Sequence, residues 1–155
     1  MLLLQLRKAL KQAGDPARAQ GMQAYMKSAM PYHGVPTPVH RALCKAVFAD
    51  VQFATAAQWQ AQVLEIWRNA RFREERYAAL HLAGDKRARA FQTPAAVKMY
   101  EEMIVTGAWW DYVDGIASHR IGQILRGYPA PMHRKMLAWS EDRKHRSLHA
   151  GNEAQ

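Results

Sequence analysis

Apolar residues recur every three or four positions along most of this chain, and that spacing predicts amphipathic helices. Turns that contain Gly, Pro or Thr-Pro separate the apolar runs and predict where the helices begin and end. The predicted helices cover residues 2–13, 16–30, 38–50, 55–69, 71–83 and 94–107, with one more from residue 109 and a short one after Pro131. No run alternates apolar and polar residues with β-branched enrichment, so the sequence predicts no sheet. We therefore expect an all-α fold, either a compact bundle or the stacked antiparallel helix pairs of a HEAT-like solenoid.

The same spacing predicts which side chains of the third and fourth helices are buried. These are Leu43, Cys44, Val47, Trp59, Val63, Ile66 and Trp67. Cys44 lies on an apolar stripe, so we expect a small core residue here rather than a nucleophile. Thr37 stands directly before Pro38, and this pair favours Thr37 as the helix N-cap with the proline as the first helical residue.

Residues 109–114, Trp-Trp-Asp-Tyr-Val-Asp, combine aromatic rings and carboxylates at the start of a predicted helix. Side chains four residues apart share a helix face, so Trp110 and Asp114 should form one unit. Trp109, Val113 and Ile116 should form a neighbouring buried stripe. Two interpretations stay open. Either the aromatic ring and the carboxylate serve a functional surface, or the tryptophans are core and the aspartates are first-turn charges favoured by the helix dipole.

Composition and charge narrow the class of protein. The chain has 155 residues, with 22 Lys and Arg against 13 Asp and Glu, and a formal charge of +9. This balance favours an anionic partner, with DNA, RNA and a membrane surface all open. The single cysteine excludes an internal disulfide and a cysteine-based zinc cage, which fits a reducing cytoplasm. The apolar run Leu2-Leu3-Leu4 is too short for a signal core or a membrane span, so we expect a soluble protein.

Histidine and arginine positions suggest no second kind of site. His33, His40 and His119 stand singly, without a pair at helical spacing, so we expect no metal site. A run of basic residues is either a solvated face or a set of phosphate contacts. It comprises Arg68, Arg71, Arg73, Arg76, Lys86, Arg87 and Arg89. Clustering of these residues with Lys27, His40 and Arg41 on one face would favour phosphate contacts.

Four segments resemble the AlkD-like DNA alkylation repair family, in the order and at about the spacing of that family. They are residues 22–27 (Met-Gln-Ala-Tyr-Met-Lys), 34–38 (Gly-Val-Pro-Thr-Pro), 101–106 (Glu-Glu-Met-Ile-Val-Thr) and 109–114. The resemblance covers roughly residues 5–140. It implies a HEAT-like solenoid whose concave face holds duplex DNA, acting in the bacterial cytoplasm at the nucleoid. It also implies a glycosylase that releases cationic alkylpurines, such as N3-methyladenine and N7-methylguanine, without a metal or a cofactor.

The residues needed for such chemistry follow from its leaving group. A cationic alkylpurine leaves without protonation, so the enzyme mainly has to stabilise an oxocarbenium-like sugar and position water. Asp114 is the candidate carboxylate, and Trp110 can offer its electron-rich face to the cation. The resemblance also implies DNA contacts from Tyr25, as a second aromatic wall, and from Lys27 and Trp109.

The end of the chain departs from the family. Family members continue past residue 155 with further helix pairs, whereas residues 141–155 lack apolar periodicity. We expect one domain over residues 1–140 and a poorly ordered tail over 141–155, in which Arg146 aligns, across a gap, near an essential arginine of the family. A truncated solenoid would leave its last apolar surface uncovered or paired with a second chain. That surface comprises Met132, Met136, Leu137 and Trp139. The alternative function is a non-catalytic helical-repeat module that binds DNA or protein.

Overall fold

The chain folds into a row of helices. A computed structural model describes residues 1–107, 112 and 116–153, without the side chains of residues 118 and 142–153. In this described part, turns and loops join helices and there is no strand, as the periodicity predicted. The α-helices are α1 (Leu2–Ala13), α2 (Pro16–Met26), α3 (Thr37–Val47), α4 (Ala56–Asn69), α5 (Arg73–Ala83), α6 (Val97–Gly107), α8 (Gly122–Gly127) and α9 (Pro129–Glu153). Shorter segments are the 3₁₀ helices η1 (Lys86–Phe91) and η2 (Pro94–Ala96) and the π-helix η3 (Ile116–Ile121).

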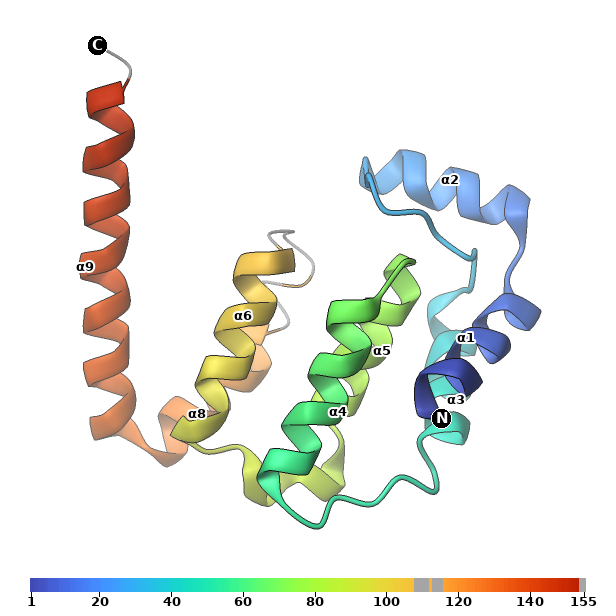
Figure 1. Cartoon of the computed structure of the whole chain (residues 1–155), viewed down its shortest axis with the longest axis horizontal. Helices are drawn as coiled ribbons and strands as arrows, with labels where there is room; N and C mark the ends of the chain where they lie inside the picture. Colours follow the sequence, from blue (N-terminus) through green and yellow to red (C-terminus); the bar gives the residue numbers. More distant parts are fainter. Residues whose placement is uncertain (108–111, 113–115, 154–155) are drawn as a thin grey trace.

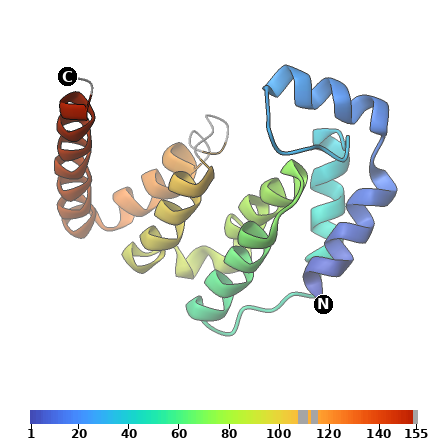
Figure 2. The same cartoon turned by 45° about the horizontal axis from the view of Figure 1, so that its top comes forward.

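Neighbouring helices pack in pairs along the row. α1 packs against α3, α4 against α5, and α6 against η3, from which α8 continues. Figure 1 shows these pairs side by side, with α2 at one edge and α9, which contacts α8, at the other. The same order is visible in Figure 2 after the rotation. The architecture is the all-α helical repeat that the sequence predicted, because each pair buries its apolar stripe against the next.

Most helix bounds agree with the predicted ones to within a few residues, and the differences have local reasons. α2 ends at Met26, earlier than predicted, because Lys27 adopts a left-handed backbone with φ 51°. Thr37 is the first residue of α3 and makes no capping hydrogen bond, so its prediction as the N-cap was wrong and Pro36 precedes the helix. The 3₁₀ helix η1 was not predicted. It starts where the Asp85 carboxylate accepts a hydrogen bond from the Arg87 N–H at 2.9 Å.

The core lies between the stacked pairs. Cys44, Trp59, Val63, Ile66 and Trp67 are fully or almost fully buried, as predicted. Leu43 and Val47 are only half-buried, because Cys44 and Phe48 occupy the face of α3 that turns inward. The Trp59 indole N–H donates to the Leu82 carbonyl at 3.3 Å and so ties α4 to α5.

α9 is longer than the predicted short helix. It runs to Glu153 because residues 141–150 contain neither Pro nor Gly to stop it. Met136 and Leu137 are 43% and 54% exposed, as expected of an uncovered surface, whereas Met132 is buried and that part of the prediction was wrong. Trp139 is partly buried and packs against the core. The predicted division of the chain at residue 140 stays a prediction.

Candidate functional site

Tyr112 is the one described residue of the Trp-Trp-Asp-Tyr-Val-Asp segment, and it is fully buried. Its ring meets Trp67 of α4 edge-on at 5.1 Å between centroids and lies 5.6 Å from the Tyr77 ring of α5. The guanidinium of Arg73 sits 4.3 Å from the centre of the Tyr112 ring. Aromatic and cation–π contacts of this kind each stabilise by about 0.5–2 kcal/mol. They hold this point of the segment against α4 and α5.

A glycine makes this close packing possible. A Cβ on Gly107 would lie 2.8 Å from Tyr112 Cδ2 and 2.9 Å from Trp67 Cζ2, which is too close for a side chain. The Trp67 indole N–H also donates to Thr106 Oγ1 at 2.8 Å. The end of α6 therefore fits around Trp67 and Tyr112, immediately before the segment from Trp109 to Asp114.

Arg73 lies buried among tyrosines. Its guanidinium is 5.8 Å from the Tyr32 ring centre and 5.5 Å from that of Tyr77. Arg73 Nη2 donates to the Tyr77 hydroxyl at 3.1 Å, and the Tyr77 and Tyr32 hydroxyls hydrogen-bond at 3.0 Å. Three tyrosines from separate parts of the chain, Tyr32, Tyr77 and Tyr112, are thereby held around one cation.

The buried carboxylate of Glu74 fixes the connection between α2 and α3. It accepts hydrogen bonds from the backbone N–H groups of His33 (2.8 Å), Gly34 (2.8 Å) and Val35 (3.0 Å). Three donors directed at one carboxylate offset the penalty of burying its charge. Glu74 therefore fixes the segment that carries Tyr32 relative to α5.

These elements enclose a cavity of about 580 Å³, here called the tyrosine cavity. Its lining residues are Met22, Tyr25, Met26, Tyr32, Val35, Thr37, His40, Arg41, Glu74, Tyr77, Leu80, His81 and Arg120. Tyr25 contributes from α2 although its side chain is 84% exposed, so its ring stands at the rim. Tyr77 lines this cavity and also contacts Tyr112, so Tyr112 packs against a residue of the cavity wall.

A second cavity of about 760 Å³, here called the basic cavity, lies beside the first. Its lining residues are Arg41, Ala42, Lys45, Phe48, Ala49, His81, Gly84, Asp85, Lys86, Arg87 and Arg120. Arg41, His81 and Arg120 line both cavities, so the two share a wall. The combined surface offers aromatic rings at one end and cations at the other, a combination suited to bases and phosphates.

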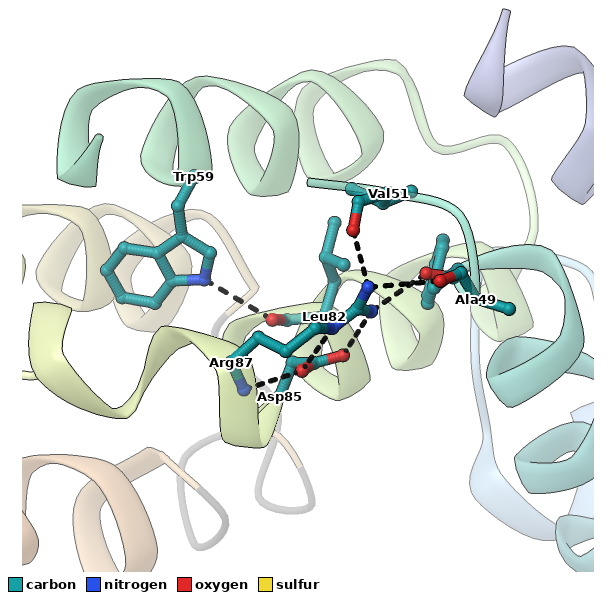
Figure 3. A network of polar contacts seen from close by, with 7 residues as sticks. Ala49, Val51, Trp59, Leu82, Asp85 and Arg87 are labelled. Atoms are coloured by element: carbon teal, nitrogen blue, oxygen red, sulfur yellow. Dashed lines mark hydrogen bonds and ion pairs between the residues drawn. The ribbon is translucent and has the colours of Figure 1, made fainter. Parts of the chain in front are cut away.

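One acidic residue of the basic cavity already has a partner. Asp85 accepts from Arg87 Nε at 3.0 Å and from Arg87 Nη2 at 2.8 Å, and this bonding lowers the pKa of Asp85. Figure 3 shows the Arg87 guanidinium reaching from η1 to the chain that follows α3, where it donates to the carbonyls of Phe48, Ala49 and Val51. Arg87 thus joins two connections of the fold, which is a structural role.

Two histidines in the cavity walls have lowered pKa values. Burial lowers the pKa of His40, whose Nε2 donates to the Glu74 carbonyl at 2.9 Å. Burial also lowers the pKa of His81, and the positive charges of Arg41 and Arg120 act in the same direction while Asp85 opposes them. Cys44 behaves as the predicted core residue, since burial raises the pKa of its thiol to about 12. A thiol of that pKa is a poor nucleophile at neutral pH.

The predicted site residues fall into three groups. Trp109, Trp110 and Asp114 lie outside the described residues, and so does the side chain of Arg146. Tyr25 stands at the rim of the tyrosine cavity. Lys27 ends α2 with its backbone N–H donating to the Ala24 carbonyl at 3.2 Å, and it lines neither cavity.

The predicted basic run does not form a single face. Arg68 pairs with Glu102, Arg73 is buried, and Arg76 stacks 4.5 Å from the Trp67 ring centre. Of that run, only Lys86 and Arg87 line the basic cavity. His40 and Arg41, which do not belong to the run, line the tyrosine cavity.

His81 and Arg120 line both cavities but were not among the residues predicted from the sequence. Their sole sequence signal is a polar residue within an apolar helical run, which is too common to identify a site. Within the described residues, no group of three or more His, Cys, Asp or Glu side chains could hold a metal ion. Nor does any helix of that part have the length and apolar character needed to cross a membrane.

The fold and these cavities define a helical-repeat protein with one aromatic and basic surface. A family model described as DNA alkylation repair enzyme matches residues 6–145. The match covers most of the chain, and the chain belongs to this family. A comparison with curated proteins found no match.

Proposed function

We propose that this chain is a DNA repair glycosylase of the bacterial cytoplasm and nucleoid. It hydrolyses the N-glycosidic bond of cationic alkylated purines, N3-methyladenine and N7-methylguanine, in duplex DNA. The observation that carries this proposal is the contact between Tyr112 and Tyr77. It places Tyr112, the described residue of the Trp-Trp-Asp-Tyr-Val-Asp segment, beside a residue of the tyrosine cavity, whose lining includes tyrosines and arginines. Membership of the DNA alkylation repair family supports a role in the repair of alkylated DNA.

The proposed reaction is a hydrolysis with water as the only co-reactant. The bond between the sugar C1′ and the purine nitrogen breaks, and its electron pair leaves with the base, which becomes neutral. The oxygen of water bonds to C1′, and its proton passes to a carboxylate and then to solvent. No acid has to protonate the leaving base, because that base already carries a positive charge.

The two residues that we assign to the chemical step, Asp114 and Trp110, belong to the same segment of the sequence as Tyr112. Asp114 stabilises the developing positive charge of the sugar and orients the water. Trp110 offers its ring face to the cation, an interaction of about 0.5–2 kcal/mol. Trp109 and Tyr25 contact bases, while Lys27 and Arg146 contact phosphates.

The test is the single-turnover release of N7-methylguanine from methylated duplex by the wild type and by Asp114→Asn. The variant keeps the size of the side chain but removes its charge, so release should slow at least about tenfold, equivalent to about 1.4 kcal/mol of transition-state stabilisation. Binding of the duplex should hold or improve, because a negative charge near phosphates is removed. Asp111→Asn is the matched control, with thermal melts of all three proteins. Equal release rates for the wild type and Asp114→Asn would remove Asp114 from the mechanism.

The second candidate is a non-catalytic helical-repeat module that binds DNA or protein. The observation that favours it is the exposed apolar pair Met136 and Leu137 on α9, which offers a surface to another chain. Self-association through this surface stays a prediction. Intact folding and DNA binding without any base release by the wild type would support this candidate against the glycosylase.

A further inference from the structure

The Arg120 guanidinium occupies space that Gly84 leaves free because glycine has no side chain. Arg120 belongs to η3, while the facing Arg41 belongs to α3 and His81 to α5. A Cβ on Gly84 would overlap the Arg120 guanidinium, so that group fills the space a side chain at position 84 would take. Three nitrogen-bearing side chains from separate elements therefore meet at the wall between the tyrosine cavity and the basic cavity.

The positive charges at this wall are not neutralised by the acidic side chains that line the two cavities. Asp85 is engaged by Arg87, and the Glu74 carboxylate is engaged by three backbone N–H groups. In the part of the chain that the structure describes, neither Arg41 nor Arg120 forms an ion pair. His81 Nδ1 is buried, and no hydrogen-bond partner for it occurs among the same residues. Two guanidinium groups without ion pairs, with an imidazole beside them in the same wall, are complementary to an anion.

We propose that Arg41, His81 and Arg120 form a subsite that binds one phosphodiester group of the DNA backbone. The guanidinium groups donate hydrogen bonds to the two non-bridging oxygens of the phosphodiester, and the His81 imidazole supplies a further donor. A strand bound here would continue into the tyrosine cavity, which shares these three residues. The proposal rests on the proposed action on duplex DNA and adds the residues that fix the position of the strand.

The salt dependence of DNA binding tests the arginine part. Fluorescence anisotropy with an unmodified duplex and the full chain gives the slope of log affinity against log salt concentration. Each lost phosphate contact lowers the magnitude of that slope by about 0.9. Arg120→Gln should show this loss, and Arg120→Lys, which keeps the charge, should retain the slope of the wild type.

Arg126→Gln is the matched control, since Arg126 is an exposed residue of α8 that lines neither cavity. It removes the same charge from the neighbouring helix. Equal slopes for Arg120→Gln and Arg126→Gln would overturn the subsite. Thermal melts establish that each variant is folded, and a variant that unfolds is replaced by Arg41→Gln, for which the same loss is expected.

The pH dependence of binding tests the histidine part. The pKa of His81 lies below its usual value in the free protein, and a phosphate beside it would raise that pKa. The complex then binds a proton that the free protein lacks, so affinity should rise as pH falls from about 8 to 6. The other titratable or charged groups that act on His81 are His40, Arg41, Asp85 and Arg120, and burial lowers the pKa of His40 as well.

His81→Gln should lose part of this pH dependence, whereas His133→Gln, at an exposed residue of α9, should retain it. The same pH dependence in His81→Gln and the wild type would overturn the role of His81. These binding measurements need no base release. If the wild type releases N7-methylguanine but Arg120→Gln keeps the full salt slope, the subsite is wrong and the glycosylase stands. If the slope falls but nothing is released, the subsite stands and the glycosylase is wrong.

Discussion

Replacing Glu74 by glutamine should weaken the fold by removing one acceptor from a buried cluster of donors. In the native protein, Oε1 accepts from the His33 N–H, while Oε2 accepts from the N–H groups of Gly34 and Val35. An amide has only one oxygen, so at best it keeps the two bonds at the Oε2 position. Its NH2 group then faces the N–H of His33, donor against donor.

The expected loss follows from these three bonds. A hydrogen bond to a charged group stabilises by about 1.5–3 kcal/mol and one between neutral groups by about 0.5–1.5 kcal/mol. Losing one charged bond and weakening two others by about 1–1.5 kcal/mol each gives about 3.5–6 kcal/mol, a large part of the about 5–15 kcal/mol that stabilises a typical domain. Glu74→Gln should therefore lower the free energy of unfolding by that amount.

Urea denaturation followed by circular dichroism at neutral pH measures this loss. Glu101→Gln makes the same chemical change at an exposed residue of α6 and should leave stability almost unchanged. Hydrogen exchange adds a local measurement, because the amides of His33, Gly34 and Val35 should exchange faster in Glu74→Gln. A stability loss below about 1 kcal/mol, with unchanged exchange at these amides, would refute the assigned role of the carboxylate.

Two further predictions concern buried groups. Burial lowers the pKa of His40 below its usual 6.5, so His40 binds a proton more readily in the unfolded chain than in the folded protein. The free energy of unfolding should therefore fall as pH drops below about 6.5. His40→Gln should reduce that fall by up to about 1.4 kcal/mol per pH unit in urea titrations, and identical pH profiles for both proteins would contradict the prediction. Gly107→Ala forces a Cβ against Tyr112 and Trp67 and should cost about 1–3 kcal/mol, measured as a lower melting temperature. Gly21→Ala is its control in α2, where a Cβ meets nothing within 4 Å, and an equal change in both variants would refute the packing argument.

Local sequence patterns predicted the helices because each pattern lies within one element. The spacing of Trp59, Val63, Ile66 and Trp67 sets the buried face of α4, and no distant residue is needed to see it. The left-handed backbone of Lys27 carries no such pattern, since most left-handed residues are glycine or asparagine.

The candidate site was less predictable, because its residues meet across the fold. Glu74 binds the backbone of residues about 40 positions earlier, and the binding partners are N–H groups that every sequence has. Arg73 looked like one more surface cation, but the fold buries it among Tyr32, Tyr77 and Tyr112. Such contacts depend on how the helix pairs stack, and apolar periodicity does not contain that information.

The close fit of Arg120 over Gly84 has an evolutionary consequence. The guanidinium is the free end of a flexible side chain, so an alanine at position 84 would displace it with little loss of stability. Mutation at position 84 can thus remove a cation from the wall without touching position 120. Lineages that keep arginine at 120 in this conformation must keep glycine at 84, while lineages that lose the arginine are released from that requirement. The two positions should therefore change together during descent, although 36 residues separate them in the chain.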